Sequence, residues 1–435
     1  MKKGFITYRD PEGGVKLHFR WDSKDLGVLI INSAKVVYLN RTAAFYVEQM
    51  LKGVDPGKVA KKAVRKFKGL TLEKAKRDYE EIVYKINSLI MGDVCPVTYL
   101  GLERIDPLTF ETRAPFRVDL AVTYDCNNRC IHCYSASPRT LKNELNTKGW
   151  KRAILKLFKV GVPNVVFTGG EPTLRSDLNE LISYAENLGM VTGLVTNGRK
   201  LSNKRYLDTL LEAGLDYIQV TLESHRPEIH DKITQVKGSW KETIQGIRNI
   251  LDAGVYLDVN MTLSKLNCME VEEYVDFLHE LGVRNVSANR LIYSGKGLEV
   301  KEWFEPTMEE TKMALEVLSE RTQEYGMRFR WYGVTRYCEL NPLEMGLGLK
   351  FCSACSITLA IEPDGTVIPC QSYYHPLGNI LKDKWDKIWH NPLCEAIRKR
   401  SFAGEVCREC PFLQSCGGGC PLEAKIRPFN MKPSS

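Results

Sequence analysis

The sequence predicts an α/β protein in which a partial (β/α)6 barrel lies between a small N-terminal α+β unit and a C-terminal cysteine-rich region. Three observations support this prediction. Strand-like and helical runs alternate regularly between residues 117 and 295. Short strands followed by three helical patterns occupy the first ninety residues. The last hundred residues are turn-rich and contain most of the fourteen cysteines.

Composition and cysteine use indicate a cytoplasmic metal-binding protein. The chain has 435 residues, 43% of them hydrophobic and 26% charged, which is enough apolar material for about two to four domains. We expect no signal peptide and no membrane span, because no stretch approaches about 18 uninterrupted apolar residues. Since the cytoplasm keeps thiols reduced, the clustered cysteines indicate metal rather than disulfides.

The N-terminal unit is predicted to be winged-helix-like. Short strands are expected within residues 15–39, and helices over 42–53, 56–67 and 71–90, with turn residues and helix caps between them. Residues 1–90 carry 19 Lys and Arg against 10 Asp and Glu, a net charge of +9, so the remainder of the chain has −1 and the whole chain +8. Such a basic segment suits an acidic peptide or a nucleic acid.

The domain boundaries follow from these changes in pattern. The barrel strands are expected to end in a common edge, where the chemistry of such folds takes place. Beyond the barrel, residues 302–327 look helical, and "IEPDGTVIPC" reads as a hairpin that turns at Asp364-Gly365. The expected parts are residues 1–92 (recognition unit), 93–114 (linker), 115–295 (barrel), 296–337 (helical bridge) and 338–435 (cysteine-rich domain).

A loop with three cysteines directly follows the first barrel strand. Cys126, Cys130 and Cys133 have the spacing C-x3-C-x2-C. Three thiolates can hold one face of a four-iron cubane and leave the fourth iron open, whereas a structural zinc ion would need four ligands. His132 lies between two of these cysteines in the sequence and is expected to point away from the metal.

The loop resembles that of the radical S-adenosylmethionine (SAM) superfamily, in which an aromatic residue, here Tyr134, follows the last cysteine. A second motif of that family, "FTGGEP", ends the second strand with Gly169, Gly170, Glu171 and Pro172. The resemblance implies a [4Fe-4S] cluster whose open iron is chelated by SAM, with the second motif binding the methionyl amino group. Taken alone, the second motif could be an ordinary turn.

Further strand-end residues match the family more loosely. Thr196 and Asn197 end the third strand, and Thr221 and Glu223 end the fourth, where the resemblance implies ribose or carboxylate contacts. Arg290 ends the sixth strand and is either a cofactor contact or a solvated strand-end charge.

The C-terminal cysteines form two further motifs, C-x9-G-x4-C from Cys355 and C-x2-C-x5-C-x3-C from Cys407. Together they resemble the SPASM domain, which carries auxiliary iron–sulfur clusters. The resemblance implies one cluster on Cys352, Cys355, Cys370 and Cys420, and three ligands of a second cluster on Cys407, Cys410 and Cys416. The family pattern continues with one more cysteine, and residues 421–435 contain none. The candidates for the fourth ligand are Cys394, Cys338 and a carboxylate such as Glu423, or the site is open. The alternative is that residues 407–420 bind zinc. Cys95 and Cys268 are expected to be ordinary buried thiols.

The N-terminal unit is similar to the peptide chaperone of pyrroloquinoline quinone biosynthesis, and so to the recognition element of enzymes that modify ribosomally made peptides. The resemblance implies that a leader peptide adds a strand at residues 35–40 and packs on the helix at 71–90. The rival partner is a nucleic acid, because "KVAKKAVRKFK" could contact phosphates.

These resemblances imply a radical SAM peptide maturase that crosslinks or oxidises a peptide substrate and takes electrons from ferredoxin or flavodoxin. One alternative is maturation of a partner enzyme or of a small-molecule cofactor. Another, from a different class, is a non-catalytic iron–sulfur regulator that binds DNA.

Overall fold

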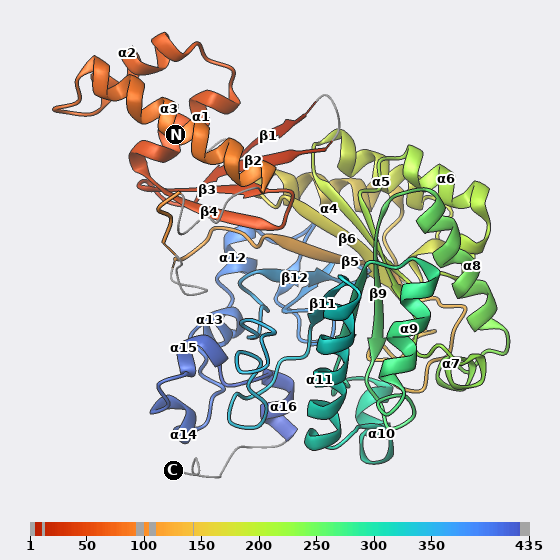
Figure 1. Ribbon diagram of the computed structural model, residues 1–435. Coiled ribbons are helices and arrows are strands. Elements are labelled where there is room, and N and C mark those ends of the chain that lie inside the picture. The colour runs from red at the N-terminus through yellow and green to blue at the C-terminus, as the bar shows by residue number, and fades with distance from the viewer. Residues whose placement is uncertain (1–4, 11–13, 93–99, 104–109, 142, 427–435) are drawn as a thin grey trace.

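The computed structural model describes residues 5–10, 14–92, 100–103, 110–141 and 143–426. Figure 1 shows three parts: an N-terminal unit, a large curved sheet covered by helices, and a C-terminal part beside the sheet. No helix in these described ranges is both long and apolar enough to cross a membrane. The predicted α/β class is confirmed.

The N-terminal unit is a four-stranded antiparallel sheet in the order β1-β2-β3-β4, followed by three helices. The strand β1 was not predicted, because "FITYR" is short and lies next to a charged turn. Each helix begins at a capping side chain: Asn40, Asp55 and Thr71 accept from the backbone N–H three residues later. The elements are β1 (Phe5–Arg9), β2 (Lys16–Trp21), β3 (Leu26–Ile31), β4 (Lys35–Asn40), α1 (Arg41–Leu51), α2 (Pro56–Lys66) and α3 (Leu72–Met91).

The central sheet contains all six predicted barrel strands, parallel and in chain order. Helices pack on its outer face and leave the strand ends free. The strands are β5 (Arg117–Thr123), β6 (Asn164–Gly169), β7 (Val191–Thr196), β8 (Tyr217–Thr221), β9 (Tyr256–Thr262) and β10 (Asn285–Asn289). The helices between them are α4 (Thr147–Val160), α5 (Leu178–Asn187), α6 (Lys204–Glu212), α7 (Pro227–Thr234), α8 (Ser239–Asp252) and α9 (Val271–Leu281), with short 3-10 turns η1 (Pro172–Leu174) and η2 (Arg199–Ser202).

The segment predicted as a helical bridge is more varied than expected. It forms two helices, α10 (Lys296–Phe304) and α11 (Met308–Glu324), separated at Pro306, which cannot continue a helix. It then forms β11 (Arg328–Trp331), which pairs in parallel with β10 and extends the sheet.

The C-terminal part adds three strands to the other side of the sheet. The predicted hairpin is present as β12 (Thr358–Ile361) and β13 (Thr366–Ile368), and Gly365 takes a positive φ of 87° at its turn. The strand β12 pairs in parallel with β5, which joins two segments more than two hundred residues apart. The remaining elements are β14 (Gly378–Asn379), α12 (Trp385–Trp389), α13 (Pro392–Arg398), α14 (Glu405–Arg408), α15 (Leu413–Cys416) and α16 (Pro421–Ile426).

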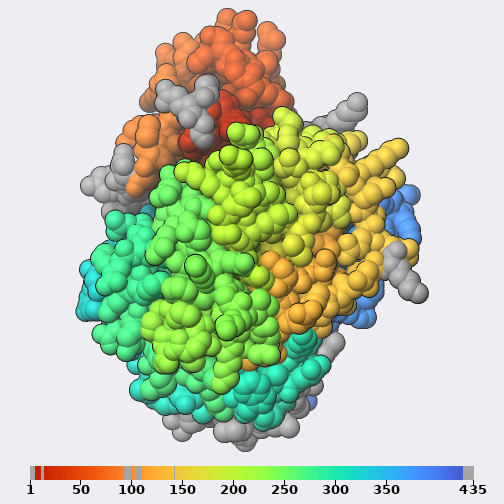
Figure 2. All heavy atoms as spheres, turned by 90° about the vertical axis from the view of Figure 1, so that its right-hand side faces the viewer, coloured from red at the N-terminus to blue at the C-terminus, as the bar shows by residue number. Residues whose placement is uncertain are grey.

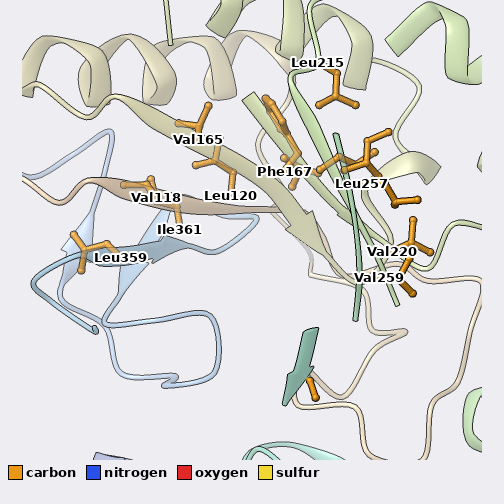
Figure 3. Packing of buried hydrophobic residues seen from close by; sticks show 14 of the residues in the cluster. Val118, Leu120, Val165, Phe167, Leu215, Val220, Leu257, Val259, Leu359 and Ile361 are labelled. Atoms are coloured by element: carbon orange, nitrogen blue, oxygen red, sulfur yellow. The ribbon is translucent and has the colours of Figure 1, made fainter. Parts of the chain in front are cut away.

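The main core lies between the sheet and its helices (Figure 3). Alternate residues of the strands, such as Val118 and Leu120 on β5 and Val165 and Phe167 on β6, are fully buried on this face. Leu359 and Ile361 of β12 belong to the same cluster, so the C-terminal part shares the core of the barrel. Burying each such side chain contributes roughly 1.5–3 kcal/mol to folding.

The N-terminal unit docks on the end of the barrel where the strands begin. The buried Lys16 of β2 forms an ion pair with Asp216 at 2.7 Å and donates to the carbonyl of Met190. His18 contacts the carbonyl of Gly189 at 2.7 Å, and burial lowers the pKa of its imidazole to about 4. Figures 1 and 2 show the unit standing at one end of the molecule, while α7 and α10, which follow strand ends, lie at the other.

Candidate active site and cysteine clusters

The carboxyl ends of the barrel strands surround a cleft with about 1050 Å³ of space. Its lining comes from the cysteine loop after β5, the glycine pair after β6 and the ends of β7 to β10. Figure 1 shows that this end of the strands faces away from the N-terminal unit. The lining includes Cys126, Cys130, Cys133, Tyr134, Gly169, Gly170, Thr196, Asn197, Thr221, Glu223 and Arg290 from the predicted set.

Two of the three loop thiols accept hydrogen bonds from the surrounding backbone. The N–H of Asn128 donates to Cys126 Sγ and that of Ser137 to Cys133 Sγ, each at 3.4 Å. Burial raises the pKa of Cys126 to about 12, and burial likewise raises that of Cys130 well above its usual value. Thiolates therefore form here only when a strong positive charge, such as a metal cluster, replaces their protons.

The spacing of the cysteines does not suit a single metal ion. Within the described ranges, no group of three or more His, Cys, Asp or Glu side chains is arranged to hold one. Sulfurs around a zinc ion lie about 3.8 Å apart, given Zn–S bonds of about 2.3 Å. Three thiols that line one cleft can instead serve three irons of a four-iron cluster.

Gly169 and Gly170 are required by a close approach of two backbone segments. A Cβ on Gly169 would lie 2.1 Å from the carbonyl oxygen of Thr123, and one on Gly170 would lie 2.3 Å from that of Asp125. The N–H of Gly170 donates to Thr123 O, and the N–H of Glu171 donates to Asp125 O, both at 2.8 Å. The end of β6 is thus bound to the start of the cysteine loop.

Glu171 and Pro172 are buried and are not among the residues that line this cleft, and their contact with the cofactor stays a prediction. The fully buried Glu171 carboxylate accepts hydrogen bonds from the hydroxyls of Thr173 and Thr196 and from the N–H groups of Thr173 and Asn197, at 2.6–3.1 Å. Burial raises its pKa. Its role in the structure is to bind the turn after β6 to the end of β7.

Glu223 is a cleft residue whose carboxylate is also held in place. Its oxygens contact His132 Nε2 at 3.2 Å and the N–H of Thr262 at 3.0 Å. Although burial opposes ionisation, the neighbouring His132 lowers the pKa of this carboxyl. The His132 ring stacks on Phe304, with centroids 5.2 Å apart, and its Nε2 faces Glu223, in agreement with the expectation that it points away from the cysteines.

The other predicted cofactor contacts have different surroundings. Arg290 is paired with Glu305 at 3.2 Å and Glu423 at 3.3 Å, so it is not a freely solvated charge. The Tyr134 hydroxyl donates to Gln371 Oε1 at 3.1 Å, which links the cysteine loop to the C-terminal part. Thr196 and Asn197 are bound to Glu171, and Thr221 lines the cleft.

Sequence reasoning missed a polar network inside the barrel. Asp258 of β9 accepts from Gln219 and Ser287, both at 2.7 Å, and Asn260 accepts from Ser287 and Asn289, both at 3.1 Å. These residues alternate along β8, β9 and β10 with apolar residues that face the helices. This alternation in the sequence could have revealed the network. A barrel filled only for packing would have apolar residues both at the positions that face the helices and at those that face the interior.

One predicted auxiliary set is only partly assembled. Cys352, Cys370 and Cys420 face one another. Burial is the main cause that raises the pKa of the Cys352 thiol, and the neighbouring charges of Cys420 and Cys370 raise it further. Cys355, the expected fourth member, forms a disulfide with Cys394 instead. Helix α13 brings Cys394 there, because Arg398 on that helix donates to the carbonyl of Cys355 at 2.7 Å. The role of Cys355 as a ligand therefore requires this pair to be reduced.

The other set lies on and around α14 and α15 and consists of Cys407, Cys410 and Cys416. Burial is the main cause that raises the pKa of the Cys407 thiol, and the neighbouring charges of Cys416 and Cys410 raise it further. Cys268 is buried, as expected, and Cys95 lies outside the described residues. Among the proposed fourth ligands, Cys394 is in the disulfide and Glu423 is paired with Arg290.

Comparisons with known proteins agree with this geometry. Residues 120–287 match the model of the radical SAM superfamily, and residues 352–411 match that of an iron–sulfur cluster-binding domain, SPASM. The chain is 28% identical to Fe-coproporphyrin III synthase of Methanosarcina barkeri, over 70% of this chain and 82% of that protein. It is 27% identical to PqqA peptide cyclase of Rhizobium meliloti, over 71% and 83%.

Solved structures extend the similarity over nearly the whole fold. SuiB of Streptococcus suis, bound to its precursor peptide SuiA, matches with a TM-score of 0.67 at 17% identity and covers 95% of this chain and 98% of that one. The enzyme anSMEcpe, with bound AdoMet and a peptide, matches with a TM-score of 0.56 at 18% identity, over 73% and 92%.

Replacing Glu171 by Gln tests the role of its carboxylate. We expect Glu171→Gln to lower the free energy of unfolding by about 2–4 kcal/mol, because an amide group would face N–H and O–H donors in a buried network. Urea unfolding of the protein measures the change. The matched control is Glu180→Gln, whose side chain is 55% exposed and pairs with Lys151; it should change stability by less than about 0.5 kcal/mol. Equal stability of the two variants would contradict the assignment.

Proposed function

Because residues 120–287 belong to the radical SAM superfamily and residues 352–411 form a SPASM iron–sulfur domain, we propose that this chain modifies a ribosomally made peptide by radical chemistry. A [4Fe-4S] cluster bound here would supply the electron for reductive cleavage of SAM to methionine and a 5′-deoxyadenosyl radical, which would abstract a hydrogen atom from the substrate. The observation that carries the proposal is that three thiols, the glycine pair and a polar barrel interior share one cleft.

We propose a separate role for each group of residues in the cleft. Cys126, Cys130 and Cys133 would hold three irons of the cluster. The backbone at Gly169 and Gly170 can approach a bound cofactor, because no side chain stands there. Thr221 and Arg290 would contact the ribose and carboxylate of SAM from the ends of β8 and β10. Below them, the network around Asp258 offers hydrogen bonds to the backbone of a peptide and excludes bulk water from the radical.

A peptide substrate is favoured over the alternatives by the N-terminal unit. The SuiB structure, which contains a precursor peptide, covers 95% of this chain, whereas anSMEcpe covers 73%. PqqA peptide cyclase and the mycofactocin maturase MftC of Mycolicibacterium smegmatis are also relatives, at 27% and 28% identity. The alternative is a tetrapyrrole substrate, which the similarity to Fe-coproporphyrin III synthase supports.

The leader of the peptide would bind at the free edge of β4. Among the residues that the structure describes, this strand pairs only with β3, and Val36 at its edge is 39% exposed. The carboxyl end of α3 lies beside it, since Lys35 Nζ donates to the carbonyl of Leu89 at 2.5 Å. An extended peptide could add a strand here and pack on α3, and the basic surplus of the unit suits an acidic leader. The same surplus is the argument for a nucleic acid, but the exposed strand edge favours a peptide.

The edge of β4 that we propose for the leader (the leader edge) and the cleft lie toward opposite ends of the barrel. The docking contacts of the N-terminal unit are with turns that precede the strands, such as Gly161 and Gly189. The strand β5 has seven residues, so the two ends are separated by about 23 Å at about 3.3 Å per residue. The peptide would need about seven extended residues to reach from the leader edge to the cleft. We further propose a reducing cytoplasm, in which the Cys355–Cys394 pair would be reduced, and a ferredoxin or flavodoxin that donates the electron for cleavage of SAM.

The proposed reaction can be tested with the reconstituted holoenzyme under reducing, anaerobic conditions. Incubation with SAM and each small acidic peptide encoded beside the gene should yield 5′-deoxyadenosine and a peptide of altered mass, detected by mass spectrometry. Cys130→Ala should yield neither, because the cluster would lack a ligand. Absence of 5′-deoxyadenosine with the intact protein would overturn the enzymatic proposal, and consumption of a tetrapyrrole in place of the peptide would favour the alternative.

A negative charge on the β4 edge should weaken leader binding. We expect Val36→Glu to raise the Kd for the acidic peptide by about tenfold or more, equivalent to about 1.4 kcal/mol, through repulsion and a less apolar edge. Fluorescence anisotropy with a labelled leader measures this change. Met313→Glu on α11, whose native side chain is 48% exposed, is the matched control and should leave Kd unchanged. Equal binding by both variants would exclude this edge.

The length of the peptide between leader and modified residue should matter. With spacers shorter than about seven residues, we expect unchanged leader binding but little modification, because the peptide cannot span the barrel. A series of Gly-Ser spacers, analysed by mass spectrometry and anisotropy, separates the two effects. Full modification with a three-residue spacer would show that the leader binds elsewhere.

A further inference from the structure

The second SPASM cysteine set has three members on adjacent turns and needs a fourth ligand to complete a [4Fe-4S] site. Cys407 lies on α14, Cys410 follows it, and Cys416 ends α15. Cys416 is buried, while Cys407 and Cys410 are partly exposed. Any fourth ligand must therefore come from a segment that packs against Cys416 and reaches toward the surface.

The segment that precedes the SPASM domain, residues 335–340, packs in this way. The N–H of Tyr337 donates to Cys416 Sγ at 3.4 Å, and its hydroxyl donates to the carbonyl of Ser415 at 3.2 Å. On the same side, Cys416 Sγ donates to the carbonyl of Thr335 at 3.9 Å. Three hydrogen bonds thus bind this segment to the end of α15, although almost eighty residues separate them in the sequence.

Cys338 comes directly after Tyr337 in this bound segment. A tight turn follows, in which the N–H groups of Glu339 and Leu340 both donate to the carbonyl of Arg336. The side chain of Cys338 is exposed, so it is accessible to a cluster at the surface of the set. Cys407 and Cys416 both lie close enough for their charges to act on the Cys338 thiol.

The other candidate ligands are engaged elsewhere. Cys394 on α13 is fully buried in the main core beside Cys355, and Glu423 is 4% exposed and paired with Arg290 in the barrel cleft. Neither forms a contact with Tyr337 or Cys416 among the interactions of the described residues.

We propose that Cys338 is the fourth ligand of an iron–sulfur cluster held by Cys407, Cys410 and Cys416. The ligand then comes from upstream of the SPASM motifs rather than from downstream. Four thiolates leave no iron open, so this cluster would not bind the substrate directly and would serve structure or electron transfer. It would also fasten the segment after β11 to the cysteine-rich domain, which has few strands and helices of its own.

The test compares the iron and sulfide content and the EPR spectrum of reconstituted holoprotein variants. Cys338→Ala should lose about four irons and four sulfides per chain, or show the EPR signal of a three-iron cluster. Cys410→Ala should lose the same amount, and the double variant should lose no more than Cys410→Ala alone, because both residues would hold one cluster. Cys268→Ala and Cys394→Ala are the controls and should keep the iron of this cluster.

The inference rests on the proposed iron–sulfur role of Cys407, Cys410 and Cys416, and the variants distinguish two kinds of failure. Iron loss in Cys410→Ala without iron loss or spectral change in Cys338→Ala would overturn the assignment of Cys338 alone. Iron loss in neither would overturn the second cluster itself. A measurement on the wild type avoids any folding defect: iodoacetamide should alkylate Cys338 in the apoprotein and not in the holoprotein, and equal alkylation in both would overturn the proposal.

Discussion

The close contact between two backbone segments at Gly169 and Gly170 determines the positions of the other parts of the cleft. Because neither residue has a side chain, the end of β6 can pass within hydrogen-bonding distance of the chain after β5. That chain is the start of the cysteine loop, so the contact fixes Cys126 relative to the strand ends. Any larger residue at either position would separate the loop from the sheet, since the Cβ would lie closer than 2.5 Å to a carbonyl oxygen.

Polar contacts at the opposite end fix the orientation of the N-terminal unit. Arg20 of β2 is fully buried, and it donates to the carboxylate of Asp22 and to the carbonyls of Ala114, Pro115 and Gly161. A buried guanidinium is tolerated only when its charge is paired and its donors are satisfied, and both conditions hold here. Asp22 belongs to the same unit, but the three carbonyls belong to the linker and the barrel, so the unit cannot rotate without leaving buried N–H donors of Arg20 unsatisfied. The N-terminal unit and the cleft are therefore held at a fixed separation.

The parts of the structure that could be predicted from the sequence depend on local patterns. The six barrel strands have strong apolar periodicity, and the helix caps at Asn40 and Thr71 are determined by adjacent residues. The pairing of β12 with β5 and the disulfide of Cys355 with Cys394 could not be predicted, because they join segments far apart in the chain. The hydrogen bonds of Glu171 to Thr196 and Asn197 could not be predicted for a related reason, because the sequence motif does not show that the end of β7 lies beside it.

The cysteine loop and the C-terminal domain are joined by side chains rather than by a flexible linker. Tyr134 follows Cys133 and donates to Gln371, which follows Cys370. Nearby, the Arg139 guanidinium lies over the rings of Tyr124 and Tyr374, 4.0 and 5.1 Å from their centroids. Because β12 also shares the sheet and core of the barrel, the cysteine loop after β5 and the set that includes Cys370 cannot move apart independently. The hydrogen bond from Tyr134 to Gln371 therefore connects two residues that each directly follow a cysteine, one in the loop and one in the C-terminal part.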